Sequence, residues 1–133
     1  MLEVIRVDIN NLDLLWDDVS KVIDNQRMLN NWDTLDSIYT RLKSNGADLW
    51  ITKSLGSALI GATYRRADGT NTYIVEMMAS KEGSNEGWDE TIKPIEKQAK
   101  EWGCKTIQVK GRKGWQKVLK EYTPIQTTLE RSL

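Results

Sequence analysis

The chain has 133 residues, of which 19 are basic and 19 acidic, so its formal net charge is zero. A balanced charge creates no global field that would draw the protein to nucleic acid or to a membrane surface. Hydrophobic residues make up 39% of the chain and charged residues 29%, which is the composition of a globular protein. We therefore expect one domain that spans residues 1–133.

The types of reactive side chain in the sequence exclude several kinds of catalytic and metal site. The chain has no histidine, which removes the usual general base near neutral pH and excludes a Ser-His-Asp or Cys-His nucleophile system. The single cysteine, Cys104, cannot form an intrachain disulfide, and without a Cys/His cluster we expect no metal site. No apolar run approaches membrane-spanning length, and the N-terminus lacks the apolar core of a signal peptide. We expect a protein of the cytoplasm.

The first part of the chain predicts a strand and two helices. Residues 2–9 alternate apolar and polar side chains as a half-buried strand does. A helix follows, because apolar residues recur at helical spacing at Leu12, Leu15, Trp16, Val19 and Ile23. The stripe of a second helix consists of Leu35, Ile38, Tyr39 and Leu42. Asn45 and Gly46 suit the end of that helix.

Three strands follow, at residues 49–52, 58–65 and 72–79. The segment 67–70, Ala-Asp-Gly-Thr, is a strong hairpin signal between the second and third of them. We expect the three strands to form an antiparallel meander.

The third strand leads into the centre of the chain. A loop with two glycines at 80–87, a helix at 88–102 and a strand at 104–110 follow it. A strand, a helix and a strand in this order normally form a right-handed parallel crossover. The loop precedes a helix start, where free backbone N–H groups bind anions. It is the best candidate for a functional site.

Pro94 leaves two interpretations of the central helix open. If the helix begins at Trp88, the proline removes an interior hydrogen bond and should kink it. If Thr91 is the N-cap, Pro94 stands at the third position, where a missing N–H costs little.

The last part of the chain predicts a tight turn at 111–114, a helix at 115–122 stopped by Pro124, and a strand at 125–129. The complete order is β-α-α-β-β-β-α-β-α-β. The fold class is therefore α+β, with an antiparallel meander that leads into a parallel β-α-β unit.

This order resembles the GNAT superfamily of acyl-CoA N-acyltransferases over essentially the whole chain. The most family-like part is 88–133. Within it, the runs Ala-Lys-Glu-Trp-Gly-Cys at 99–104 and Gly-Arg-Lys-Gly-Trp at 111–115 are similar to small GNAT-like proteins of phages and prophages. The resemblance implies an N-acetyltransferase that uses acetyl-CoA and an unknown amine.

The resemblance also implies a place for the cofactor. In the family, acetyl-CoA lies between two splayed parallel strands, which would be 73–79 and 105–110 here. Its pantetheine pairs with the backbone of the first strand, which assigns Met77 and Met78 to the cofactor site. Its pyrophosphate lies on the loop that follows, which assigns Lys81, Gly83, Ser84, Asn85, Gly87 and Trp88. The spacing of the glycines departs from the family's Gln/Arg-x-x-Gly-x-Gly/Ala pattern, and Glu82 and Glu86 would repel phosphates unless they point away.

Glu76 is the candidate general base, since acyltransferases of this family often place a glutamate on that strand. The acceptor amine must be neutral to attack a thioester. Burial would raise the pKa of Glu76 toward a useful value. The alternative is a structural residue that faces solvent or pairs with an arginine such as Arg65.

Tyr122 is the candidate general acid, because the family often uses a tyrosine in the last helix. It falls near the end of the predicted helix, whereas the family position corresponds to Val118 or Leu119. Tyr122 could instead close the core with its hydroxyl at the surface. The oxyanion donor would be a backbone N–H near Met78.

A basic stretch follows the parallel unit and consists of Lys105, Lys110, Arg112, Lys113, Lys117 and Lys120. It could meet the ribose 3′-phosphate of CoA, chiefly through Arg112, or it could be a solvated surface. Binding of nucleic acid is a third interpretation, which the zero net charge disfavours.

Besides the acetyltransferase, a non-catalytic GNAT-like protein that binds another protein remains an open alternative. In that case tryptophans such as Trp88, Trp102 or Trp115 would fill the gap between the strands.

Overall fold

The computed structural model describes residues 3–25, 34–80, 88–110, 119–125, 129 and 131–133. The N-terminal elements are β1 (Val4–Arg6), a short 3₁₀ helix (Ile9–Asn11), α1 (Leu12–Asn25) and α2 (Leu35–Lys43). The remaining elements are β2 (Asp48–Thr52), β3 (Ser57–Arg65), β4 (Asn71–Ser80), α3 (Trp88–Thr91), α4 (Lys93–Glu101) and β5 (Cys104–Val109).

The strands form one mixed sheet with the spatial order β1-β2-β3-β4-β5. Each of the first three pairs is antiparallel, and β4 pairs with β5 in parallel. The predicted meander and the parallel unit around the central helix are thereby confirmed. The fold is mixed α+β, as the order of apolar patterns predicted.

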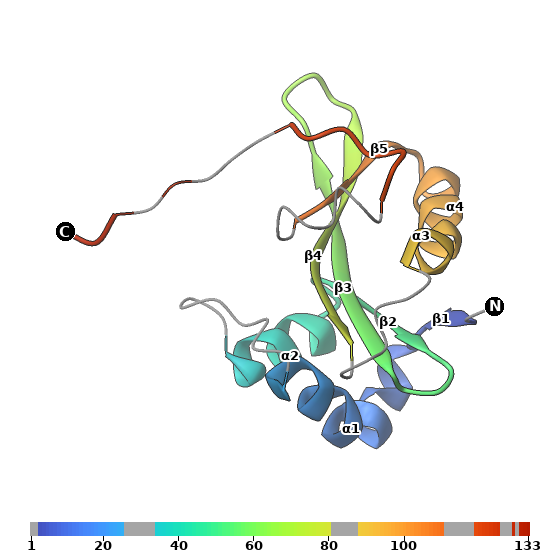
Figure 1. Ribbon diagram of the computed structural model, residues 1–133, viewed down its shortest axis with the longest axis vertical. Coiled ribbons are helices and arrows are strands. Elements are labelled where there is room, and N and C mark those ends of the chain that lie inside the picture. Colours follow the sequence, from blue (N-terminus) through green and yellow to red (C-terminus); the bar gives the residue numbers. More distant parts are fainter. Residues whose placement is uncertain (1–2, 26–33, 81–87, 111–118, 126–128, 130) are drawn as a thin grey trace.

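Each face of the sheet has its own apolar core, and helices cover both faces (Figure 1). Under α1 and α2 lie alternate residues of the strands: Leu49, Ile51, Ala58, Ile60, Ala62, Met77 and Ala79. Under α3 and α4 lie the residues between them: Trp50, Leu59, Tyr73, Val75 and Met78. Side chains alternate between the two faces of a strand, so strands covered on both faces are apolar throughout. The first six residues of β3 are all buried for this reason.

Local signals fix both ends of α2. The Thr34 side chain accepts from the backbone N–H of Ser37, and the Ser37 side chain accepts from the N–H of Thr34, which is a complete capping box. At the other end Asn45 takes the left-handed conformation with φ of 64°, and the N–H of Gly46 donates to the carbonyl of Arg41 at 2.7 Å. The predicted stop at Asn45 and Gly46 is confirmed.

The central helix combines features of both interpretations of Pro94. It begins at Trp88, but it divides at Ile92 into the one-turn α3 and the longer α4. Pro94 then lies in the first turn of α4, where helices do not use the N–H that proline lacks. The proline thus divides the helix instead of kinking a continuous one.

The prediction for the C-terminal segment was wrong where it can be compared. The described residues after β5 include no helix or strand, and Leu119 and Tyr122 instead belong to a turn in which the N–H of Tyr122 donates to the carbonyl of Leu119 at 3.1 Å. Ile125 and Leu129 are 68% and 90% exposed, so the alternating pattern does not mark a half-buried strand. Alternation specifies a strand only where a neighbouring backbone pairs with it. The segment 111–118 lies outside the described residues.

Two further properties concern the part of the chain that the structure describes. None of its helices is long and apolar enough to cross a membrane. Within the same residues, no three side chains of the His, Cys, Asp or Glu type are grouped so that they could hold a metal ion.

Candidate functional site

The pairing between the parallel strands β4 and β5 ends in the middle of β4. Its last pair is Val75 opposite Val109, just where the backbone N–H of Lys110 donates to the carbonyl of Val75 at 2.9 Å. No strand in the described ranges pairs with the β5-facing edge of β4 over residues 76–80.

A β-bulge lies at the same point of β4. On the edge toward β3, Ile60 pairs with Met77 and Gly61 pairs with Val75, so Glu76 is an extra residue between two pairs. A bulge redirects side chains locally. Val75 packs under α3 and α4, whereas Glu76 and Met77 both lie on the face covered by α1 and α2. In a strand with regular alternation, Met77 would share a face with Val75.

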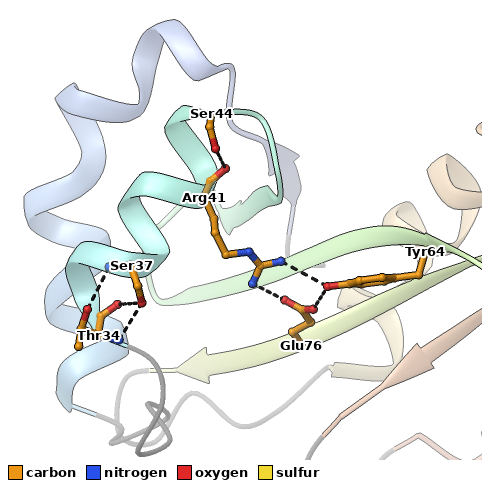
Figure 2. Close-up of polar contacts among 6 residues, drawn as sticks. All are labelled: Thr34, Ser37, Arg41, Ser44, Tyr64 and Glu76. Carbon is orange, nitrogen blue, oxygen red and sulfur yellow. Dashed lines mark hydrogen bonds and ion pairs between the residues drawn. The ribbon is translucent and has the colours of Figure 1, made fainter.

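Glu76 has a partner on each carboxylate oxygen (Figure 2). Nη1 of Arg41, from α2, donates to Oε2 at 2.7 Å, and the hydroxyl of Tyr64, from β3, donates to Oε1. Nη2 of Arg41 also reaches the Tyr64 hydroxyl at 3.4 Å. The Glu76 side chain is 18% exposed and that of Arg41 40%. We call these three residues the Glu76 group.

The charges of the Glu76 group are set by these contacts. Burial raises the pKa of Glu76, but the hydrogen bonds from Arg41 and Tyr64 and the positive charges of Arg41 and Lys110 outweigh it, so the pKa lies below its ordinary value. The expectation that burial would dominate was wrong, because a paired cation lies on the carboxylate. The hydrogen bond to Glu76, helped by burial, raises the pKa of Tyr64. Near neutral pH the group is therefore an ionised carboxylate between a cation and a phenol that retains its proton.

Arg41, and not Arg65, is the arginine that pairs with Glu76. Arg65 follows Tyr64 directly in β3, and successive side chains of a strand point to opposite faces. Since Tyr64 lies on the face of Glu76, Arg65 is directed to the other face.

Tyr122, the candidate general acid, binds a carboxylate on α4. Its hydroxyl donates to Oε2 of Glu96, on α4, at 2.8 Å. Burial, together with the bond to Glu96, raises its pKa well above the ordinary range. Tyr122 packs against the core under α3 and α4, whereas Glu76 faces α2. The structure therefore does not bring the two predicted catalytic residues together.

The predicted cofactor residues are described only in part. Met77, Met78 and Trp88 are buried, at the second half of β4 and at the start of α3. The others, Lys81, Gly83, Ser84, Asn85, Gly87 and Arg112, lie outside the described residues. The first turn of α3 carries Asp89 and Glu90, and these two acids do not favour a phosphate there.

Sequence reasoning missed Arg41 and Tyr64. The signal for Tyr64 was present, because it continues the alternation of Ala58, Ile60 and Ala62 on one face of β3. The signal for Arg41 was weaker, since it is only a basic residue beside the buried Leu42 on α2. Without the bulge in view, neither could be matched to Glu76.

A second group of polar residues combines the same residue types elsewhere. Arg6 donates to Oδ1 of Asp48 at 2.8 and 3.1 Å, the Tyr73 hydroxyl donates to Oδ2 at 2.9 Å, and Nε1 of Trp50 donates to the Tyr73 hydroxyl at 2.9 Å. We call these four residues the Asp48 group. The guanidinium of Arg6 lies 5.0 Å from the ring centre of Trp102, which tilts against both Trp50 and Tyr73. Trp102 is thus engaged at the β1 and β2 side of the sheet, and not between β4 and β5.

A hollow of about 230 Å³ lies beside the Asp48 group. Its walls come from β1, the start of α1, the end of α2 and the start of β2. The Glu76 group does not line it.

Known proteins resemble this chain in structure but not detectably in sequence. No protein-family model matches the sequence, and no curated protein matches it. Among solved structures, an aminoglycoside acetyltransferase from an uncultured soil metagenomic sample, in complex with sisomicin, has a TM-score of 0.75 at 11% identity, over 99% of this chain and 96% of that one.

Two further solved structures agree with that likeness. A GNAT family acetyltransferase of Staphylococcus aureus has a TM-score of 0.70 at 13% identity, over 99% of this chain and 98% of that one. A predicted acetyltransferase of Clostridium acetobutylicum, with acetyl-CoA, has a TM-score of 0.66 at 16% identity, over 100% of this chain and 96% of that one. At such identities the likeness concerns the fold, and the fold of this chain is that of GNAT acetyltransferases.

Proposed function

We propose that the protein is an N-acetyltransferase that moves an acetyl group from acetyl-CoA to an amine, with Glu76 as the base. The observation that carries the proposal is the coincidence of three features at one point of β4. These are the bulge, the end of pairing with β5 after Val75, and a partly buried carboxylate at the bulge. A purely structural ion pair does not need to lie where the pairing of a strand ends.

The second half of β4 fits the cofactor. Amide groups of a pantetheine arm can add to a free strand edge, as extended peptides do, and residues 76–80 offer that edge. The cradle for the pyrophosphate would come from Lys81, Gly83, Ser84, Asn85 and Gly87, and Arg112 would meet the 3′-phosphate. When bound, acetyl-CoA supplies the activated thioester. The structure with acetyl-CoA among the similar folds supports this assignment by analogy alone.

The residues of the chain would remove a proton from the acceptor and stabilise the negative charge of the tetrahedral intermediate. Glu76, held as a carboxylate, accepts the proton that the acceptor ammonium must lose before it can attack. Tyr64 keeps its proton and orients the carboxylate through Oε1. Backbone N–H groups near Met78 would stabilise the oxyanion of the tetrahedral intermediate. The intermediate would then collapse with cleavage of the thioester C–S bond, and the second proton of the acceptor nitrogen would neutralise the coenzyme A thiolate that leaves. Tyr122, bound to Glu96, is left out of this chemistry.

Binding of the cofactor is the first test. Acetyl-CoA is titrated into the protein while the fluorescence of the six tryptophans and the thermal midpoint are followed. A ligand that binds only the folded state at 100 times its Kd stabilises it by about 2.7 kcal/mol. The substitution Gly83→Ala in the proposed cradle should weaken binding, and Lys43→Gln on the exposed end of α2 should not. The absence of any response at millimolar acetyl-CoA would contradict the proposal.

A non-catalytic GNAT-like protein, similar to those of phages, is the second candidate. It is favoured by one observation, namely that both oxygens of Glu76 are already occupied. In that case the Glu76 group only ties α2 to the sheet, and the protein binds another protein. No binding of acetyl-CoA, together with a stability loss and no other change in Glu76→Gln, would support this candidate.

A further inference from the structure

The acceptor site proposed above is closed in this structure by a residue of the chain itself. Nη1 of Arg41 occupies Oε2 of Glu76 at 2.7 Å, and the Tyr64 hydroxyl occupies Oε1. Each carboxylate oxygen can accept a second hydrogen bond, but the position of Nη1 on Oε2 becomes free for the ammonium group of a substrate only when the Arg41 guanidinium leaves it.

Of the two donors, the Arg41 side chain can leave more readily. Its backbone is fixed, because its carbonyl accepts from the N–H of Gly46 and from the hydroxyl of Ser44, and Leu42 beside it is buried (Figure 2 shows the contact with Ser44). The side chain, by contrast, is 40% exposed and ends a flexible stem, so it can turn into solvent without moving α2. Tyr64 projects from a paired strand and has only the two torsions of its ring, so its hydroxyl moves little.

Charge decides what can replace the guanidinium. The Glu76 side chain is only 18% exposed, and a carboxylate at such a position loses stabilisation when its cation is removed. A neutral ligand would leave that charge uncompensated. A cationic ligand exchanges one charged hydrogen bond for another, which conserves the charge of the group. Lys110 acts on Glu76 through its charge alone, whereas Arg41 and Tyr64 also donate hydrogen bonds to the carboxylate.

We propose that Arg41 is an internal plug, which holds the place of the substrate at Glu76 and is displaced only by an acceptor that carries an ammonium group. Displacement puts the ammonium nitrogen at Oε2, with Tyr64 still on Oε1. Neutral nucleophiles such as alcohols do not open the site. The assignment rests on the proposed function for the role of the ammonium group as acceptor, but the exchange of cations itself involves no cofactor.

The test uses the whole chain without acetyl-CoA, and n-butylammonium as the probe. The side-chain carboxyl of Glu76 is followed by carbon NMR, with Glu76→Gln to assign its signal, and n-butanol is the neutral counterpart. In Arg41→Gln the probe should bind about tenfold more tightly than in the wild type, a factor that corresponds to 1.4 kcal/mol. Butanol should have no effect on either protein. Lys43→Gln removes a charge from the same helix where it pairs with the exposed Asp13, and it should behave as the wild type.

The wild type gives a second measurement that does not depend on the folding of a variant. The nitrogen signals of the Arg41 guanidinium should shift along the same titration curve as the Glu76 carboxyl. Equal affinity in the wild type and Arg41→Gln, or a Glu76 signal that moves while that of Arg41 does not, would overturn the proposal. A parallel titration with acetyl-CoA separates the two claims. Failure of acetyl-CoA to bind contradicts the acetyltransferase, and failure of butylammonium to displace Arg41 contradicts the plug.

Discussion

The Glu76 group and the Asp48 group use the same residue types in different surroundings. Each joins an arginine to one oxygen of a carboxylate and a tyrosine hydroxyl to the other. In the Asp48 group, Tyr73 is fully buried, receives a further hydrogen bond from Trp50, and fills the space beside Gly61. In the Glu76 group, Tyr64 is 40% exposed, and the carboxylate lies at a bulge where the pairing of β4 with β5 ends.

The comparison teaches that burial and strand pairing, and not residue type, distinguish a polar group that stabilises the fold from a candidate functional site. The Asp48 group connects β1, β2 and β4 across continuous pairing, and removal of the Tyr73 hydroxyl leaves Nε1 of the buried Trp50 without its acceptor. The Glu76 group connects α2 to two strands where the pairing of β4 with β5 ends, and its arginine and tyrosine are 40% exposed. Substitutions in the first group should therefore affect folding, and those in the second should affect binding and catalysis.

The largest effect is expected for Glu76→Gln on acetyl transfer. Loss of a general base typically costs about 10²–10⁴-fold in rate, which is about 3–5 kcal/mol of activation free energy. Transfer from acetyl-CoA to an amine found by screening would be measured by release of free thiol. The thermal midpoint should change little. Full activity in Glu76→Gln would remove Glu76 from the mechanism.

A large effect on stability is expected for Gly61→Ala, beside Tyr73 of the Asp48 group. A Cβ at this position would lie 2.6–2.8 Å from the ring and hydroxyl of Tyr73, so the buried ring would have to move. Overpacking of this kind costs about 1–3 kcal/mol, and we expect the upper end. Urea unfolding measures it. Gly46→Ala is the control, since its nearest neighbouring atom is at 3.4 Å, and an equal loss there would show that the Tyr73 contact is not the cause.

A matched pair of tyrosine substitutions compares the two groups directly. Tyr73→Phe removes the acceptor of Trp50 and a donor to Asp48 in a buried place, and it should cost about 1–3 kcal/mol of unfolding free energy. Tyr64→Phe should cost about 1 kcal/mol or less. It should raise the pKa of Glu76, because one of the bonds that lower it is lost. A larger destabilisation by Tyr64→Phe than by Tyr73→Phe would contradict the assignment of the Asp48 group to stability and of the Glu76 group to function.

The smallest effect is the pH dependence of the Arg41 and Glu76 pair. The folded pKa of Glu76 lies below its ordinary value of 4.5, so the pair stabilises the fold fully above that pH and progressively less as the pH falls through the folded pKa. Because the guanidinium is partly exposed, the contribution is about 1 kcal/mol at most. The difference in unfolding free energy between the wild type and Glu76→Gln should shrink from pH 7 to pH 3. A constant difference would mean that the charge of Glu76 does not contribute.

Much of the fold was predictable from local patterns. The helical stripes of α1 and α2, the alternation in β3 and the Asp-Gly turn before β4 gave the elements in their correct order. Such patterns are readable because burial on one face imposes a fixed period on the sequence. The last predicted helix and strand failed in their described residues, because a pattern does not state which backbone is available for pairing.

The sequence by itself determined the residue types available for chemistry, the order of the elements and the candidate carboxylate Glu76. Only the tertiary structure decided that Arg41 from α2 and Tyr64 from β3 meet this carboxylate, and that Tyr122 binds Glu96 instead. The physical reason is that these contacts join residues far apart in the chain, which only the pairing of β3 with β4 and the packing of the helices on the sheet bring together. The register between two strands is a property of both strands together and not of either sequence alone.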